Sequence, residues 1–137
     1  MFATADDMRA RFGEDVLVQL TDQDAWNAQA IAAIGVKIAS ATAIAEGYVA
    51  KYYAPAPGRA IPPLLTDIVC DLAFARLYRE PPEAVKDRAT DAMRQLRDIS
   101  NGLIKIDQGA QDIPARPGAI IVPDTPRTFS RDRLGGF

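Results

Sequence analysis

From Ala28 to Tyr53 the chain reads AQAIAAIGVKIASATAIAEGYVAKYY. Apolar residues recur in this stretch at steps of three and four, namely Ile31, Ile34, Ile38, Ala41, Ala45, Tyr48 and Tyr52. That spacing places all seven on one side of an α-helix. An apolar stripe of this length is unfavourable in water, so we expect the helix to be central and covered by other parts of the chain.

The segment from Leu64 to Tyr78 is the predicted partner of the long helix. Pro55 and Pro57 prevent the long helix from continuing, whereas proline at 62 or 63 is tolerated in the first turn of a new helix. Apolar residues then occupy most of the circumference of this second helix: Leu64, Leu65, Ile68, Val69, Cys70, Leu72, Ala73, Phe74 and Leu77. Such a helix belongs in the centre of a bundle.

A third long helix is predicted after Pro82, ending at Asn101 and Gly102. Its apolar stripe consists of Val85, Ala89, Ala92, Met93, Leu96 and Ile99. The rest of its surface is charged, and Arg94 and Asp98 are four residues apart, so they can form an ion pair. This charged surface is either solvated or faces a neighbouring subunit.

Two short helices are predicted before the long one. Thr4 can cap the first by accepting a hydrogen bond from the amide of Asp7, and Gly13 ends it. The second covers 14–20, with Val16, Leu17 and Leu20 on its apolar side. Helices this short are unstable alone, so we expect them to fold against the long helix, with Trp26 as an anchor. In the polar turn that follows the second helix, Asp22 or Asp24 is expected to cap the long helix.

Residues 103–137 differ in character from the rest. Residues 103–106 and 119–122 are typical of short strands, and prolines and glycines separate and follow them. These residues hold too little apolar surface for a core, so they form either a disordered tail or an arm that becomes ordered on a partner. The aromatic residues and arginines favour the arm. Its predicted contact residues are Ile104, Ile106, Ile120, Val122, Phe129, Arg131, Arg133, Leu134 and Phe137.

The predicted fold is therefore all-α: a small bundle of a long central helix, two further long helices and short N-terminal helices over residues 1–102. An extended C-terminal arm with short β segments follows over residues 103–137.

Composition and charge exclude several classes of function. The net charge of −2 is unfavourable for nucleic-acid binding, which usually needs a basic face. No apolar run reaches about eighteen residues, so no transmembrane helix and no membrane partner are expected. The N-terminal residues lack the apolar core of a secretory signal, which fits a cytoplasmic product. One cysteine excludes an internal disulfide, and Cys70 is expected to be buried.

No catalytic or metal-binding constellation is found in the sequence. There is no histidine, hence no imidazole base or ligand. Asp22 and Asp24 do not continue into a calcium loop, which needs glycine and glutamate where Asn27 and Ala33 stand. Asp67 and Asp71 are four residues apart and are either an acid–base pair or, as we expect, neutralised by a nearby arginine or lysine. We expect no enzyme activity, no cofactor and no metal.

The sequence resembles the Mu-like prophage head–tail connector or adaptor protein family over its whole length. The resemblance is carried by MFATADDMRARFG at 1–13, LVQLTD at 17–22, Gly47-Tyr48 through Tyr52, IPPLL at 61–65, Ala73 with Arg76-Leu77-Tyr78, and FSRDRLGGF at 129–137. Many relatives carry an Asp-x-Asp-Gly turn after Leu-Thr-Asp, whereas Ala25 and Trp26 occupy the glycine region here.

The resemblance implies a component of the virion neck of a tailed phage. It implies a homo-oligomeric, dodecameric ring beneath the portal protein, which extends the DNA channel and docks a downstream stopper or tail-completion protein. DNA would pass through without specific binding, and the arm would insert into the portal or a neighbouring copy. The alternatives are a helical assembly chaperone or protein-interaction module that leaves before maturation and, from a third class, a small hydrolase or regulator.

Overall fold

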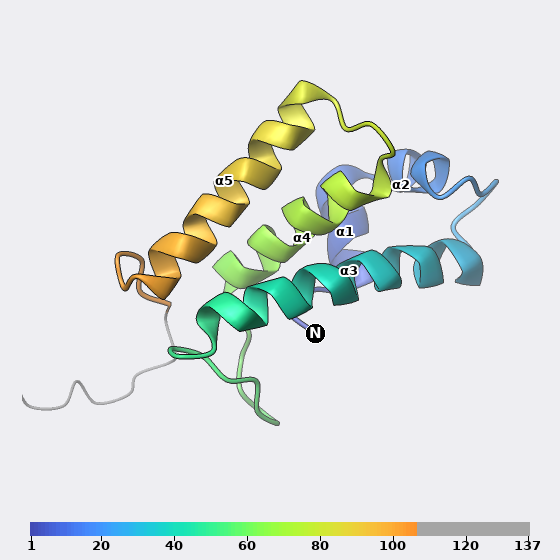
Figure 1. Cartoon of the computed structure of the whole chain (residues 1–137). Coiled ribbons are helices and arrows are strands. Elements are labelled where there is room, and N and C mark those ends of the chain that lie inside the picture. Colours follow the sequence, from blue (N-terminus) through green and yellow to red (C-terminus); the bar gives the residue numbers. More distant parts are fainter. Residues whose placement is uncertain (107–137) are drawn as a thin grey trace, which may run out of the picture.

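Five helices make up the computed structural model, which describes residues 1–106. They are α1 (Ala5–Phe12), α2 (Glu14–Leu20), α3 (Ala28–Val49), α4 (Pro63–Leu77) and α5 (Glu83–Ser100). Figure 1 shows α4 between α3 and α5, with α1 behind the middle of α3 and α4 and α2 nearer to the start of α3. The all-α prediction is confirmed for residues 1–106, which contain no strand.

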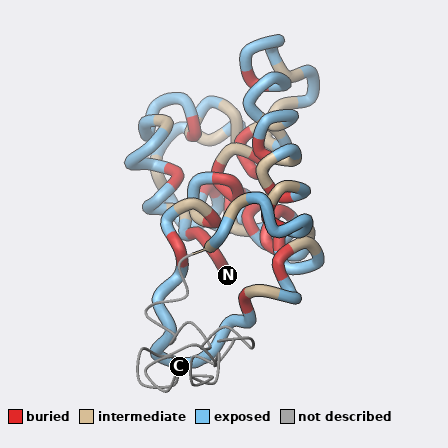
Figure 2. Tube along the Cα trace, turned by 90° about the vertical axis from the view of Figure 1, so that its left-hand side faces the viewer, coloured by how far each residue is buried: buried red, intermediate tan, exposed pale blue. Residues whose placement is uncertain are grey.

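Helix α4 is the centre of the bundle, as its sequence predicts. Its first residue is Pro63, and it buries Leu65, Ile68, Val69, Cys70, Leu72, Ala73 and Phe74. Helix α5 packs its own apolar stripe on one side of α4, burying Val85, Ala92, Leu96 and Ile99. In Figure 2 the buried residues gather on the sides of the helices that face one another. The charged residues of α5 are exposed except for Asp98, which is half-buried. Arg94 pairs with Asp91 at 3.4 Å and not with Asp98.

Helix α3 packs on the other side of α4, but its buried face differs at both ends from the predicted stripe. Ile34, Ile38, Ala41 and Ala45 are buried as predicted, whereas the face continues through Ala30 and Val49, and Ile31 is 41% exposed. The helix ends at Val49 and not at Tyr53. A turn follows in which the amide of Tyr53 donates to the Val49 carbonyl at 2.8 Å, so Tyr53 is still buried.

By length and average hydropathy α3 could also cross a membrane, the one described helix of which this is true. The search for about eighteen consecutive apolar residues did not find α3, because polar residues interrupt its apolar sequence. Core helices satisfy the same criterion, and α3 packs against α1, α2, α4 and α5.

The two N-terminal helices cover one face of the bundle, and α1 packs against both α3 and α4. Thr4 and Asp7 form a reciprocal cap, with the Asp7 amide donating to Thr4 Oγ1 at 3.2 Å, as predicted. Phe12 of α1 stacks on Phe74 of α4 with ring centroids 3.9 Å apart. Trp26 packs against the core and lies under the Arg9 guanidinium of α1, which supports its predicted anchoring role.

Two details of this region differ from the prediction. Leu17 is buried and Leu20 partly so, but Val16 is exposed. The cap of α3 is Asn27, whose side chain accepts from the Ala30 amide at 2.8 Å, and not Asp22 or Asp24. The turn at 21–27, in which Asp22 adopts a positive φ of 54°, delays the start of the helix past both aspartates.

Candidate functional site

The most concentrated polar cluster in residues 1–106 joins α1 to α4. Arg11 donates to Asp67 at 2.6 Å and to both oxygens of Asp71 at 3.0 and 3.1 Å. Burial raises the pKa of Asp71, and the Arg11 guanidinium opposes that rise. Asp67 and Asp71 are thus neutralised by an arginine, as expected, and the cluster has a structural role.

Cys70 is buried in the core beside this cluster, as predicted. Burial, with a smaller contribution from the nearby carboxylates, raises its pKa to about 11. A thiol is nucleophilic only as the thiolate, so Cys70 behaves as a small apolar side chain near neutral pH. Across residues 1–106, moreover, no three acidic or cysteine side chains are placed to hold a metal ion.

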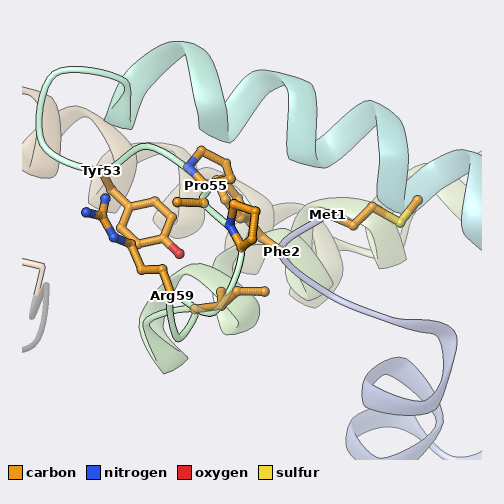
Figure 3. Close-up of a pocket in the computed structure, with 8 residues that line it drawn as sticks. Met1, Phe2, Tyr53, Pro55 and Arg59 are labelled. Atoms are coloured by element: carbon orange, nitrogen blue, oxygen red, sulfur yellow. The ribbon is translucent and has the colours of Figure 1, made fainter.

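A different surface has the character of a binding site. It lies where α3 ends, and we call it the Tyr53 end: residues 50–62 and 101–106, together with Met1 and Phe2. A hollow of about 320 Å³ lies there. Figure 3 shows Tyr53, Pro55 and Arg59 on one side of it and Met1 on the other. Its lining is completed by Phe2, Ala56, Pro57 and Ile61.

Contacts between distant parts of the sequence fix the floor of this hollow. The Phe2 ring meets the Tyr53 ring edge to face at 5.8 Å. The backbone of Phe2 is held on both sides, since its carbonyl accepts from Thr66 Oγ1 at 2.9 Å and its amide donates to Thr42 Oγ1 at 3.4 Å.

The loop after α3 forms the rim. The Tyr53 hydroxyl donates to the Ala60 carbonyl at 3.1 Å, and Arg59 donates to the Ala54 carbonyl at 3.0 Å. The Arg59 guanidinium also lies 5.8 Å from the centre of the Tyr53 ring. These bonds hold a proline-rich loop in one conformation and place a cation beside an apolar hollow.

Two smaller hollows adjoin the first. One of about 290 Å³ is lined by Glu46, Ala50, Tyr53, Ala54 and Pro55. The other, of about 270 Å³, is lined by Tyr52, Gly102, Ile104, Lys105 and Ile106. Apolar hollows with polar groups at their edges are suited to accepting apolar side chains of another segment or protein.

Two of the residues predicted to contact a partner lie at this end. Ile104 and Ile106 are partly buried against the chain's own core, and residues 103–106 form no strand. The strand prediction is wrong there because the turn at Gly102 folds the segment back, with the amides of Leu103 and Ile104 donating to the Asp98 carbonyl. The other predicted contacts lie outside the described residues: Ile120, Val122, Phe129, Arg131, Arg133, Leu134 and Phe137.

Sequence reasoning did not identify Phe2, Tyr53 and Arg59 as parts of one site. The sequence did contain one sign of this site: the proline-rich segment 54–59, which separates two long helices and places a loop between them. The pairing of Phe2 with Tyr53 has no local signature in the sequence.

Comparison with known families gives one finding about the chain as a whole. The family model described as bacteriophage Mu, Gp36 matches residues 2–122. No curated protein matches the sequence significantly.

Proposed function

Because the chain belongs to the bacteriophage Mu Gp36 family and is thus a phage protein, we propose that it is a structural component of the virion neck. In this proposal it is a head–tail connector or adaptor that forms a homo-oligomeric ring beneath the portal protein. The ring extends the DNA channel and provides a docking surface for a downstream stopper or tail-completion protein.

The observation that carries the proposal is the extent of the family match. It runs past the helical bundle to residue 122 and so includes part of the C-terminal segment. The bundle buries a core of its own within residues 1–106. A segment that belongs to the family and follows a bundle with a core of its own is suited to contacts with other chains.

The C-terminal segment supplies the proposed contacts with the portal or with a neighbouring copy. Aromatic residues and arginine dominate the energetics of protein interfaces. The proposed anchors are Phe129, Arg131, Arg133, Leu134 and Phe137, with the apolar residues Ile120 and Val122 before them.

The charge of the chain supports a channel through which DNA passes. A net charge of −2 gives no general attraction for phosphates, which protein–DNA binding normally requires. A weakly acidic wall allows DNA to slide without being held. The proposed role therefore involves protein contacts, with no catalysis, no cofactor and no specific DNA site.

Mass spectrometry of purified virions of the phage that encodes the chain tests this function. We expect the chain in mature particles at a fixed ratio to the portal protein, and antibody labelling should place it at the head–tail junction. An assembly chaperone would be present in infected cells and missing from mature particles, and that result would refute the structural role.

A further inference from the structure

We infer that copies of the chain associate head to tail, with residues 13–27 of one copy against the Tyr53 end of the next. We call residues 13–27 the acidic end. The inference deepens the proposed function by naming the surfaces that join neighbouring copies. It rests on that function only for the closure of the assembly into a ring.

The two ends carry charges of opposite sign. The acidic end contains Glu14, Asp15, Asp22 and Asp24. Beside it lie Arg9, over the Trp26 ring, and Arg79, which lines a hollow with Asp22, so negative charge stays in excess. Residues 50–62 and 101–106 contain Lys51, Arg59 and Lys105, and Glu46 lines a hollow with Tyr53, so positive charge stays in excess there. Among the ion pairs of residues 1–106, Glu14 has one weak contact with Arg9 at 3.8 Å, and the other three carboxylates of the acidic end and the three cations of the Tyr53 end have none.

Helix α3 separates these two sets of charges. It begins directly after the acidic end and finishes at the Tyr53 end, and its 22 residues extend over about 33 Å. Figure 1 shows the two ends on opposite sides of the molecule. Exposed charges this far apart are screened from one another at physiological salt, where the Debye length is about 8 Å. A second copy can bring them into contact.

Exposed apolar side chains accompany the charges at both ends. Val16 on α2 and Ile31 in the first turn of α3 are exposed beside the carboxylates. At the Tyr53 end Met1, Ile61 and Leu103 are exposed around the apolar hollows, Leu103 to 77%. Apolar contacts surrounded by complementary polar groups are the usual composition of a specific interface.

The symmetry of such a contact agrees with a ring. The two surfaces differ, so the interface is heterologous, and heterologous interfaces produce closed rings or open filaments. The rotation between neighbouring copies at this interface then sets the number of members of the ring.

An alternative is that these charges only stabilise α3 within one subunit. Asp22 and Asp24 precede the N-terminus of α3, and Lys51 follows its C-terminus, which is the arrangement that stabilises a helix dipole. In that case reversing the charges lowers thermal stability without affecting association. Measuring association between two differently charged variants distinguishes stabilisation of the helix from contact between copies.

The test uses sedimentation velocity of the full chain over a range of concentrations. The first variant, Asp15→Lys/Asp24→Lys, leaves the acidic end with no net charge, and the second, Lys51→Glu/Lys105→Glu, makes the Tyr53 end acidic like the other end. All four positions are exposed. The matched control, Asp87→Lys/Arg94→Glu, alters exposed charges on α5 at neither end.

We expect the wild type to associate more weakly as salt is raised. Each double variant alone should associate at least tenfold more weakly than the wild type. An equimolar mixture of the two should regain association, because the unaltered basic end of the first variant can then meet the unaltered acidic end of the second. The control should behave like the wild type.

Three results would overturn the inference: a wild type that stays monomeric at low salt and high concentration, variants that associate normally, or a mixture that does not recover. These outcomes are independent of the proposed function, because occupancy of the virion is measured separately. A protein present at the neck with unaltered association of the variants would retain its function and lose only this interface.

Discussion

Arg11 donates from Nη2 to both carboxylate oxygens of Asp71, at 3.1 Å to Oδ1 and 3.0 Å to Oδ2. The two residues are 60 positions apart, and the pair joins α1 to α4. Asp71 is only 16% exposed, so removing its partner leaves a carboxylate poorly hydrated. Arg11→Ala should therefore lower the free energy of unfolding by about 1–3 kcal/mol, measured by urea denaturation.

The control for that prediction is Arg94→Ala on α5. Arg94 and Asp91 form an exposed pair, both more than 60% accessible. Exposed pairs contribute less than about 1 kcal/mol, so this variant should be close to the wild type. Equal losses in the two variants would mean that the Arg11 pair contributes no more than a surface pair.

Two isoleucines three residues apart on α3 have different surroundings. Ile34 is fully buried, whereas Ile31 is 41% exposed. Ile34→Ala should lower the free energy of unfolding by about 2–5 kcal/mol, because it removes a core side chain and leaves a cavity. Ile31→Ala should cost less than about 1 kcal/mol in the isolated subunit. Similar losses at both positions would contradict the burial described for α3.

Gly102 has a φ of 77°, and a Cβ at this position would lie 3.2 Å from the Tyr52 hydroxyl. Gly58 has the same φ, but no atom lies within 4 Å of its Cβ position. In both alanine variants the left-handed conformation should lower the free energy of unfolding by about 1–2 kcal/mol. Gly102→Ala should be destabilised further by the contact with Tyr52. In a Tyr52→Phe background that excess should disappear, which thermal melts of the four variants can detect.

The burial of Cys70 leads to a pH dependence. Its pKa is about 11 in the folded chain, against 9.0 for an unperturbed thiol. Between these values the folded state binds the proton and the unfolded state has lost it, so this contribution to stability falls as pH rises, by up to about 1.4 kcal/mol per pH unit. The stability advantage of the wild type over Cys70→Ala should therefore shrink from pH 9 to pH 11. A stability difference between the wild type and Cys70→Ala that stays constant over this pH range would contradict the prediction.

The arm can be tested by deleting residues 126–137. The helices described in residues 1–106 should remain folded, because their core is made within that range. Binding to the portal protein, measured by co-purification or surface plasmon resonance, should be lost. The control is the full-length chain with Arg94→Ala, which should bind normally. Retained portal binding by the deletion variant would refute the proposed anchors.

Helix α4 was predictable because its evidence is local. Apolar residues on nearly all of its sides require burial on all sides, whichever elements surround it. The error at Ile31 arises because the spacing allows two starting points for the stripe. Ala30 and Ile31 both continue the series that runs through Ile34 and Ile38, and the structure buries Ala30 and exposes Ile31.

The Tyr53 end was not predictable for a related reason. Its hollow depends on the contact between Phe2 and Tyr53 and on the hydrogen bond from Thr66 to the Phe2 carbonyl, which joins residues 64 positions apart. The cap of α3 shows the same limit locally. Asp22, Asp24 and Asn27 are all good N-cap residues, and the conformation of the turn, not residue type, selects Asn27.

Trp26 is the single tryptophan of the chain, and it lies half-buried at the acidic end beneath Arg9. The chain therefore carries an intrinsic fluorophore at one of the two surfaces proposed to meet. When a second copy displaces water from that surface, the emission of the indole should shift to shorter wavelength. Assembly can thus be followed in real time, in unlabelled protein, from the light of one side chain.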